Sequence, residues 1–259
     1  MSRWVLVTGG AVRLGREICL AFGRAGWNVA CHYLHSQQAA QELAEALCAQ
    51  GGQAIAIQGA LDEPAGAEAV FRRATEAAGA PPACVVNNAS VFVPDAGGDF
   101  QPEQMLARLK TNLVVPLLFG RLLHESGADA DASVVHILDQ KVFNLNPDYF
   151  SYTLSKLALE RSVAQQAQAL APRVRVNAVA PGLMYPSGPQ TRENFDAAAR
   201  ANLLRAPIDP VRVAEAVAFL AGNPSITGST LCVDNGQHLV PLPRDIMFVV
   251  DELLAGSRP

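Results

Sequence analysis

The N-terminal segment places a short strand, a glycine turn and a helix in immediate succession. Residues 4–8 are apolar and partly β-branched, which predicts a buried strand, and Gly9-Gly10 predicts a tight turn at its end. A helix is expected from Leu14 to about Ala25, closed by Gly26. This order is the opening unit of a parallel sheet with crossover helices, and few other folds begin in this way.

The same alternation continues along the chain. Strands are expected at residues 4–8, 28–33, 53–58, 83–87, 133–138, 174–179 and 229–233. Helices are expected between them: one capped by Ser36 and ending at Gly51-Gly52, one opened by Asp62 and Pro64, and others at 102–126, 150–170 and 211–221. Strands that alternate with helices predict a doubly wound α/β fold of the Rossmann type, with a parallel seven-stranded sheet covered by helices on both faces. Since no linker interrupts the pattern, residues 1–259 are expected to form a single dinucleotide-binding domain.

Three irregular stretches interrupt the regular pattern. Two of them, residues 91–101 and a segment from Leu183 through about 200, follow predicted strands and lie at the carboxyl edge, where such sheets bind ligands. They are candidate walls of a substrate pocket. The third is the tail, residues 237–259, whose apolar run at 246–250 is expected to pack on this subunit or on a neighbour rather than on a membrane.

Composition excludes several classes of function. Half of the residues are hydrophobic and 17% are charged, which fits a sheet buried on both faces and excludes a disordered chain. The 24 acidic and 20 basic side chains are scattered, so a nucleic-acid partner is not expected. No apolar run approaches the roughly 20 residues that span a bilayer, and three residues before the first strand leave no room for a leader. The five cysteines lack metal-ligand spacing and indicate reduced core thiols in a cytoplasmic protein without a metal site.

Tyr152 and Lys156 are the first candidates for chemistry. Residues four apart lie on the same face of a helix, so the phenol and the ammonium point into one volume. A nearby cation favours the phenolate and lowers the pKa of a tyrosine, which would make Tyr152 a usable proton donor. Taken alone, the pair is weak evidence, because tyrosine and lysine at this spacing are common on solvated helix surfaces.

The glycine turn and the end of the second strand predict a cofactor. Gly9 and Gly15 bracket a backbone that can approach a pyrophosphate, although an ordinary βα turn gives the same pattern. The second strand ends without the acidic residue that would hold a ribose diol. It offers His32, His35 and Ser36, with Arg13 from the turn, which favours the 2′-phosphate of NADP over NAD. In the alternative interpretation, His35 faces solvent and Arg13 serves the pyrophosphate only.

The combined motifs resemble the short-chain dehydrogenase/reductase family over nearly the whole chain. They are the turn from Thr8 to Gly15, Asn87-Asn88-Ala89-Ser90, Asn112, Tyr152 with Lys156, Asn177 with Pro181-Gly182, and Ile226-Thr227-Gly228. The resemblance implies that Tyr152 is the general acid, that Lys156 holds the nicotinamide ribose and that Asn112 helps anchor a water relay. It also implies cofactor contacts from Gly9, Arg13, Leu14, Gly15, His32, His35, Ser36, Leu61, Asn88, Ala89, Ser90, Tyr152, Lys156, Pro181 and Gly182.

Two positions depart from the usual pattern of that family. Where the family commonly has a serine thirteen residues before the tyrosine, this chain has Asp139. An ionised carboxylate accepts hydrogen bonds but donates none, so it suits a substrate that presents N–H donors or receives a proton. Asp139 is otherwise a buried polar residue satisfied by backbone amides. The second departure is Ala60, followed by Leu61, where an aspartate commonly contacts the adenine amine.

Asp139 directs the resemblance toward the pteridine reductase and dihydromonapterin reductase group. The run from His32 to Ser36, the run from Asn88 to Phe92, and Asp139 ahead of Tyr152 match its pattern, except that His35 stands where the group often has arginine. The resemblance implies that a pterin ring stacks on Phe92, with hydrogen bonds from Ser90, Arg13, Asp139 and Tyr152. Phe92 is equally compatible with a loop aromatic that faces the core.

Three functional hypotheses follow. The first is an NADPH-dependent reductase of a C=N bond in a pterin-like small molecule, with Tyr152 as proton donor. The second is a carbonyl or 3-oxoacyl reductase of another small substrate, and the third is a non-catalytic NADP-binding sensor or scaffold. Resemblance to the family also implies a homo-oligomer, either a tetramer or a dimer, built on the long helices around Asn112 and Tyr152.

Overall fold

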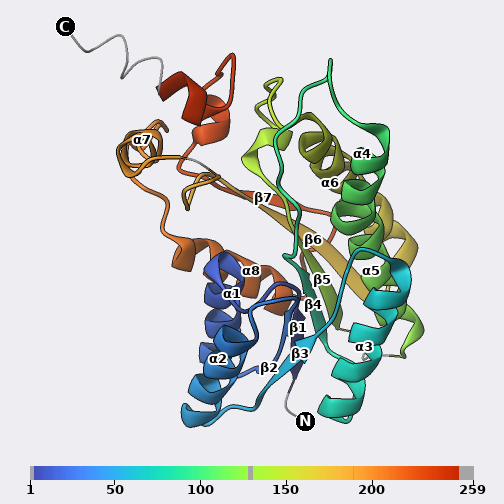
Figure 1. Cartoon of the computed structure of the whole chain (residues 1–259). Helices are drawn as coiled ribbons and strands as arrows, with labels where there is room; N and C mark the ends of the chain where they lie inside the picture. Colours follow the sequence, from blue (N-terminus) through green and yellow to red (C-terminus); the bar gives the residue numbers. More distant parts are fainter. Residues whose placement is uncertain (1–2, 128–130, 189, 251–259) are drawn as a thin grey trace, which may run out of the picture.

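A parallel sheet of seven strands, in the order β3-β2-β1-β4-β5-β6-β7, forms the centre of the molecule (Figure 1). The computed structural model describes residues 3–127, 131–188 and 190–250. The strands are β1 Trp4–Val7, β2 Asn28–Tyr33, β3 Ala54–Gln58, β4 Cys84–Asn87, β5 Ala132–Ile137, β6 Val174–Pro181 and β7 Thr230–Val233. The chain moves outward from β1 to β3 and then returns to β4, so the order reverses between β1 and β4. This is the switch point where doubly wound sheets bind ligands.

Helices cover both faces of the sheet. The α-helices are α1 Arg13–Arg24, α2 Gln37–Ala49, α3 Pro64–Ala78, α4 Pro102–Leu109, α5 Val115–Glu125, α6 Phe150–Leu170, α7 Arg192–Ala198 and α8 Pro210–Gly222. Figure 1 shows α1, α2 and α8 on one face and α3, α5 and α6 on the other. Each layer buries its own hydrophobic cluster against the sheet. The fold class predicted from the alternating pattern is therefore confirmed.

The central strands are buried on both sides. Val5, Leu6 and Val7 of β1 have no exposed surface. Burying one such side chain contributes about 1.5–3 kcal/mol relative to leaving it in water. This two-sided burial is the physical reason that β1 is a continuous apolar run rather than an alternating one.

Three local features differ from the expectations. Ser36 stands at the N-cap of α2, as predicted, but its side chain makes no capping hydrogen bond. The helical region predicted at 102–126 is divided into α4 and α5 by a π-helical turn, Lys110–Val114. Helix α7 was not predicted, because it has only seven residues and depends on the Thr191 side chain, which accepts a hydrogen bond from the amide of Asn194.

The cysteines are not all core residues. Cys19, Cys31 and Cys84 are buried and Cys232 is half-buried, but Cys48 is exposed. The expectation of a core thiol is wrong for Cys48, because this residue lies near the end of α2 on a side that faces solvent. Burial of Cys84 raises the pKa of its thiol to about 12.

The tail packs back onto the same chain at the carboxyl edge of the sheet, beside α7 (Figure 1). Ile246, Met247 and Val250 are buried, and the Asn194 side chain of α7 donates a hydrogen bond to the Met247 carbonyl at 2.7 Å. Residues 251–259 of the predicted tail lie outside the described residues. Within the part of the chain that the structure describes, no helix combines the length and the apolar character needed to cross a membrane.

Candidate active site

Tyr152 and Lys156 project from the buried side of α6 and lie close together, as their spacing predicts. The Lys156 ammonium lies 5.7 Å from the centroid of the Tyr152 ring. Its Nζ donates a hydrogen bond of 2.7 Å to the Ile137 carbonyl at the end of β5. Both residues are buried, so the alternative of a solvated surface pair is wrong.

Asp139 follows β5 and faces Tyr152. The Tyr152 hydroxyl donates a hydrogen bond of 3.0 Å to Oδ2 of Asp139. The Lys141 amide donates one of 2.9 Å to Oδ1 and thereby caps a 3₁₀ turn, η2 Gln140–Val142. Burial raises the pKa of Asp139, although the Lys141 amide, the Lys141 charge and Tyr152 all oppose the shift.

The protonation of the pair differs from the expectation. Lys156 was expected to lower the pKa of Tyr152, but burial raises that pKa well above its usual value, and the Asp139 carboxylate raises it further. Burial also lowers the pKa of Lys156 to about 8, against the opposing effect of Asp139. The site therefore holds a protonated phenol that donates to a carboxylate.

Asn112 lies in the π-helical turn and is fully buried. Its Oδ1 accepts a hydrogen bond of 2.8 Å from the Val91 amide, and its Nδ2 donates bonds of 3.0 Å to the Val91 carbonyl and 3.1 Å to Ser155 Oγ. Ser90 Oγ also donates to Oδ1, at 3.3 Å. Asn112 therefore fastens the segment after β4 to α6. Its role as a relay anchor stays a prediction.

The glycine turn is packed so tightly that side chains are excluded from it. A Cβ at Gly15 would lie 2.0 Å from the Gly9 carbonyl oxygen, and Gly9 itself has a φ of +60°. The Asn88 side chain donates hydrogen bonds of 3.0 Å to the carbonyls of Thr8 and Gly9. The open backbone at the start of α1 fits a pyrophosphate, because amides and the positive end of the helix dipole point into it.

His32 does not have the role expected of it. It is buried, its Nδ1 accepts a hydrogen bond of 3.0 Å from the Gly9 amide, and its Nε2 lies 3.0 Å from the Gly59 carbonyl. Burial lowers its pKa, so the ring is neutral. Because both nitrogens are engaged by backbone, His32 supports the turn and has no N–H to offer to a phosphate.

A cavity of about 990 Å³ joins the glycine turn to Tyr152. Fifteen of the predicted site residues line it: Gly9, Arg13, Leu14, His32, His35, Leu61, Asn88, Ala89, Ser90, Phe92, Asp139, Tyr152, Lys156, Pro181 and Gly182. Gly15, Ser36 and Asn112 do not contribute to the lining that the structure describes, since they lie behind or beside it.

Arg13 bridges the two walls of this cavity. Its Nη2 donates a hydrogen bond of 3.1 Å to the Pro186 carbonyl, and its guanidinium lies 5.0 Å from the centroid of the Tyr185 ring. Its backbone φ is +51°, an uncommon value for a residue with a side chain. Arg13 thus ties the glycine turn to the loop after β6 while lining the cavity.

Phe92 lies in an aromatic cluster beside the proton donor. Its ring stacks on Tyr149, with centroids 4.1 Å apart and planes at 16°, and meets Tyr152 edge-on at 4.6 Å. Phe92 is 38% exposed, so the alternative of a core-facing aromatic is not supported. One face of the ring is covered by Tyr149, which leaves the other parts of the ring for a planar ligand.

Asp95 anchors the loop that carries Phe92 and was not predicted. Its carboxylate accepts hydrogen bonds from the Ser151 amide at 3.0 Å and the Ser151 hydroxyl at 2.5 Å, and it forms a buried ion pair with Arg108. The loop is therefore fixed to the first turn of α6, two residues from Tyr149. Long-range contacts of this kind leave no pattern in a single sequence.

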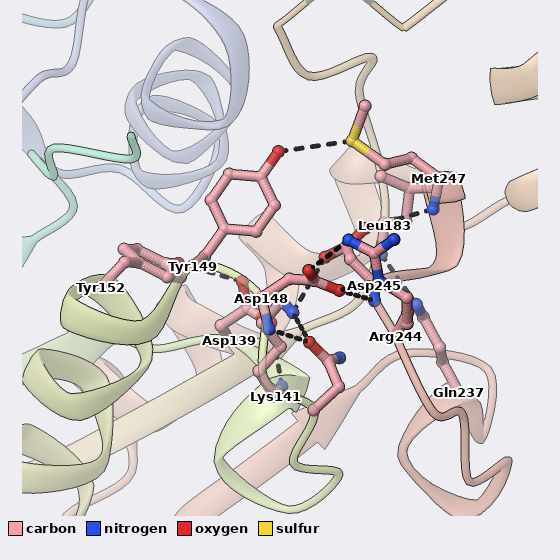
Figure 2. Close-up of polar contacts among 11 residues, drawn as sticks. Asp139, Lys141, Asp148, Tyr149, Tyr152, Leu183, Gln237, Arg244, Asp245 and Met247 are labelled. Atoms are coloured by element: carbon pink, nitrogen blue, oxygen red, sulfur yellow. Dashed lines mark hydrogen bonds and ion pairs between the residues drawn. The ribbon is translucent and has the colours of Figure 1, made fainter. Parts of the chain in front are cut away.

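The tail supplies a wall that sequence reasoning also missed. Leu242, Asp245, Ile246 and Met247 line the cavity together with Lys141 and Tyr149. Figure 2 shows Asp245 and Met247 of the tail near Asp139 and Lys141. The only signal in the sequence was the apolar run at 246–250, which predicted packing but not its location.

Fold, turn, phenol–ammonium pair and cavity together define the class of protein. A family model described as "Enoyl-(Acyl carrier protein) reductase", of the short-chain dehydrogenase/reductase class, matches residues 10–238. The chain belongs to the short-chain dehydrogenase/reductase family of oxidoreductases.

Individual relatives differ in the substrates for which they are named. The chain is 31% identical to 3beta-hydroxysteroid dehydrogenase 1 of Eggerthella lenta, over 93% of this chain and 95% of the relative. It is 27% identical to dihydromonapterin reductase of Citrobacter koseri, over 91% and 96%. A crystal structure of FolM alternative dihydrofolate reductase 1 from Brucella canis, complexed with NADP, superposes with a TM-score of 0.85 at 34% identity, covering 92% of this chain and 94% of that one.

Proposed function

We propose that this protein is an NADPH-dependent reductase that reduces a C=N bond of a pterin-like ring. The observation that carries the proposal is the hydrogen bond of 3.0 Å from Tyr152 to Asp139, which places a carboxylate where the family commonly has a serine hydroxyl. Solved relatives bound to NADP and relatives named for dihydromonapterin and dihydrofolate support it. When bound, NADPH supplies the hydride.

The chain's own residues hold the cofactor and deliver the proton. Backbone amides after Gly9 would hold the pyrophosphate, and Arg13 and His35, which both line the cavity, would hold the 2′-phosphate. Lys156 of α6, whose Nζ is steadied by the Ile137 carbonyl at the end of β5, would hold the nicotinamide ribose. Tyr152 keeps its proton in the resting site, because burial raises the pKa of its phenol. It releases this proton to the ring nitrogen, which takes the π electron pair of the C=N bond when hydride adds to the carbon.

Asp139 has two functions in this proposal. As an acceptor it binds N–H donors of the heteroaromatic ring, and because burial raises its pKa it can take up a proton and return it to Tyr152. Phe92 provides an aromatic surface of 38% exposure beside the Tyr152 ring, on which a planar ring stacks.

A substrate panel tests this assignment. The purified protein is mixed with NADPH and, in separate reactions, with a dihydropterin, dihydrofolate, a 3-oxoacyl thioester and a 3-oxosteroid, and the loss of NADPH absorbance is followed. Turnover of dihydropterins with kcat/KM at least about tenfold above the carbonyl substrates is expected, since a pterin ring presents N–H donors to the Asp139 carboxylate and a simple ketone does not. Turnover of the carbonyl substrates alone would reject the pterin assignment.

A ketone reductase is the second candidate. Apolar side chains from the loop after β6 and from the tail, including Leu183, Met184, Ile246 and Met247, line the cavity and favour a bulky apolar substrate. The relative named for 3β-hydroxysteroids supports the same alternative. The panel above separates the two candidates directly. A non-catalytic binding protein, the third hypothesis, predicts that no substrate on the panel is turned over.

We further propose that the chain works as a cytoplasmic homotetramer. Leu106 of α4 and Val114 of the π-helical turn are 60% and 43% exposed, on the helices that the family resemblance assigns to the subunit interface. Phe219 of α8 and Leu231 of β7 are also exposed large apolar residues. Light scattering of the purified protein measures the assembly, and a monomeric mass would reject it.

A further inference from the structure

The segment from Val240 to Val250 returns to the catalytic end of the molecule and contacts the chain just after Asp139. The Asn144 side chain donates a hydrogen bond of 2.8 Å to the Val240 carbonyl. The Tyr149 hydroxyl donates one of 3.3 Å to the Met247 sulfur (Figure 2). Tyr149 in turn stacks on Phe92. The tail therefore touches the site through side chains that already face the cavity.

Two cation–carboxylate contacts fix this segment in place. Lys141 Nζ lies 2.9 Å from Oδ2 of Asp245, with side-chain exposures of 5% and 13%. Arg244 meets Asp148 at 2.7 Å, with the arginine 47% exposed, and the Asp245 amide also donates to Asp148, at 2.7 Å. Both side chains of the first contact are nearly buried, whereas in the second contact Arg244 is half exposed and only Asp148 is nearly buried. Figure 2 shows the two contacts side by side.

Lys141 is held at both of its ends. Its amide donates to Oδ1 of Asp139 at 2.9 Å, and its Nζ donates to Asn146 at 2.8 Å in addition to pairing with Asp245. Oδ2 of Asp139 accepts the hydrogen bond of the Tyr152 hydroxyl. Lys141 therefore connects the tail carboxylate to the carboxylate that orients the proton donor.

We propose that Lys141 and Asp245 form a positioning pair for the reaction: the tail carboxylate holds Lys141, and Lys141 holds the Asp139 carboxylate against Tyr152. This inference rests on the proposed roles of Tyr152 and Asp139. It assigns to the tail a part in setting the rate, beyond its part in shaping the cavity.

The charges around Asp139 make the pair distinguishable from a purely structural one. Asp139 faces Tyr152 and Lys156 from α6, Lys141 from its own turn and Asp245 from the tail. The Lys141 cation lowers the pKa of Asp139, and the Asp245 carboxylate raises it. Removal of one partner should therefore move the titration of the site in one direction, and removal of the other should move it in the opposite direction.

The test uses Asp245→Asn, Lys141→Met, the double variant and Arg244→Met in the full-length protein. For each, kcat is measured against pH with the best substrate of the panel, together with the Kd for NADPH and the unfolding temperature. We expect kcat to fall about tenfold in each single variant, since a small misplacement of reacting groups is costly, with NADPH affinity retained. The acid limb, where Asp139 takes up a proton, should move to lower pH in Asp245→Asn and to higher pH in Lys141→Met.

The double variant should return the limb toward its position in the parent, because both charges are then absent. Arg244→Met is the matched control, since it loosens the same segment by removing the ion pair with Asp148 and leaves Lys141 and Asp245 in place, and its limb should not move. If Lys141→Met does not fold, Lys141→Gln and Asp245→Asn provide the same pair of opposite shifts.

Two results overturn the inference in different ways. Limbs that move in the same direction in both single variants, or that do not move, would show that the pair only stabilises the fold. Tyr152→Phe is assayed in parallel. If Tyr152→Phe is inactive but the acid limbs of Asp245→Asn and Lys141→Met do not move, the positioning pair alone is rejected. An active Tyr152→Phe rejects the proposed function and the inference together.

Discussion

The cofactor end and the substrate end of the cavity are built in different ways. At the glycine turn, main-chain atoms make the site: Asn88 bonds to the carbonyls of Thr8 and Gly9, and the Gly9 amide bonds to His32. At the substrate end, side chains from η2, α6 and the tail converge, and Asp245 lies about a hundred residues from its partner Lys141. A site made of backbone tolerates exchange of most neighbouring side chains, whereas a site made of side chains changes with each of them.

Tyr152→Phe should produce the largest effect and act on the substrate end only. Loss of the proton donor is expected to lower kcat by about 10²–10⁴-fold, the usual contribution of general acid catalysis. The Kd for NADPH, measured by quenching of protein fluorescence, should stay close to that of the parent. Tyr33→Phe is the control, since it removes the hydroxyl of a buried tyrosine on β2 that is not among the described lining residues, and a comparable loss of kcat there would argue against proton donation as the cause.

Gly15→Ala should damage the cofactor end only. The added Cβ would lie 2.0 Å from the Gly9 carbonyl oxygen, so the turn must move away from the start of α1. The affinity for NADPH is expected to fall by about a hundredfold, comparable to about 2.7 kcal/mol. Gly222→Ala, where nothing lies within 4 Å of the new Cβ, is the matched control and should bind normally. Normal NADPH binding by Gly15→Ala would show that the turn is more adaptable than its packing indicates.

The smallest expected effect is a loss of NADPH affinity in mild acid, which acts on the cofactor end of the cavity. His32 is neutral because burial lowers its pKa, and its Nδ1 must accept the Gly9 N–H. A histidine with a lowered folded pKa stabilises the native turn above its unfolded pKa of about 6.5, and this contribution is lost as the pH falls through the folded value. NADPH affinity should therefore weaken as the pH falls through the lowered folded pKa of His32, where the ring gains a proton and Nδ1 can no longer accept the Gly9 N–H.

Global unfolding must be followed in the same titration. Burial lowers the pKa of His136 to about 4, so core stability also decreases as the pH falls from about 6.5 toward that value. A His32→Asn variant keeps a hydrogen-bonding side chain but does not titrate, and its NADPH affinity should be insensitive to the same change in pH. If the variant and the parent weaken in parallel, His32 is not the cause.

The two ends also differ in how far the sequence predicts them. The first strand, the glycine turn and the helix after it follow from local preferences, and the sequence predicts them. The proximity of Tyr152 and Lys156 follows from helical spacing, and the sequence predicts it as well. Asp139 was identified through resemblance, because β5 and α6 meet only in the folded chain. The prediction that His32 offers an N–H to a phosphate and the prediction of a lowered Tyr152 pKa are wrong for one reason: burial depends on neighbours that are distant in the sequence.

Tyr149, Lys141 and Asp245 illustrate what sequence alone does not reveal. Tyr149 has a φ of +57°, a conformation that local preference would not assign to tyrosine. Lysine and aspartate are residue types usually found at the surface, yet the side chains of Lys141 and Asp245 are nearly buried, where they pair with each other. A single sequence contains no record of which distant residue satisfies a buried charge.

The π-helical turn at Lys110–Val114 has a consequence for insertions and deletions. Such a turn is equivalent to an α-helix into which one residue has been added, and each residue of an α-helix advances the chain by about 100° of rotation. Deletion of one residue from this turn would join α4 and α5 into one continuous helix and rotate one against the other by about that angle. Asn112 would then face away from Val91. The number of residues in this helix, and not only their identity, therefore determines whether the loop after β4 is held.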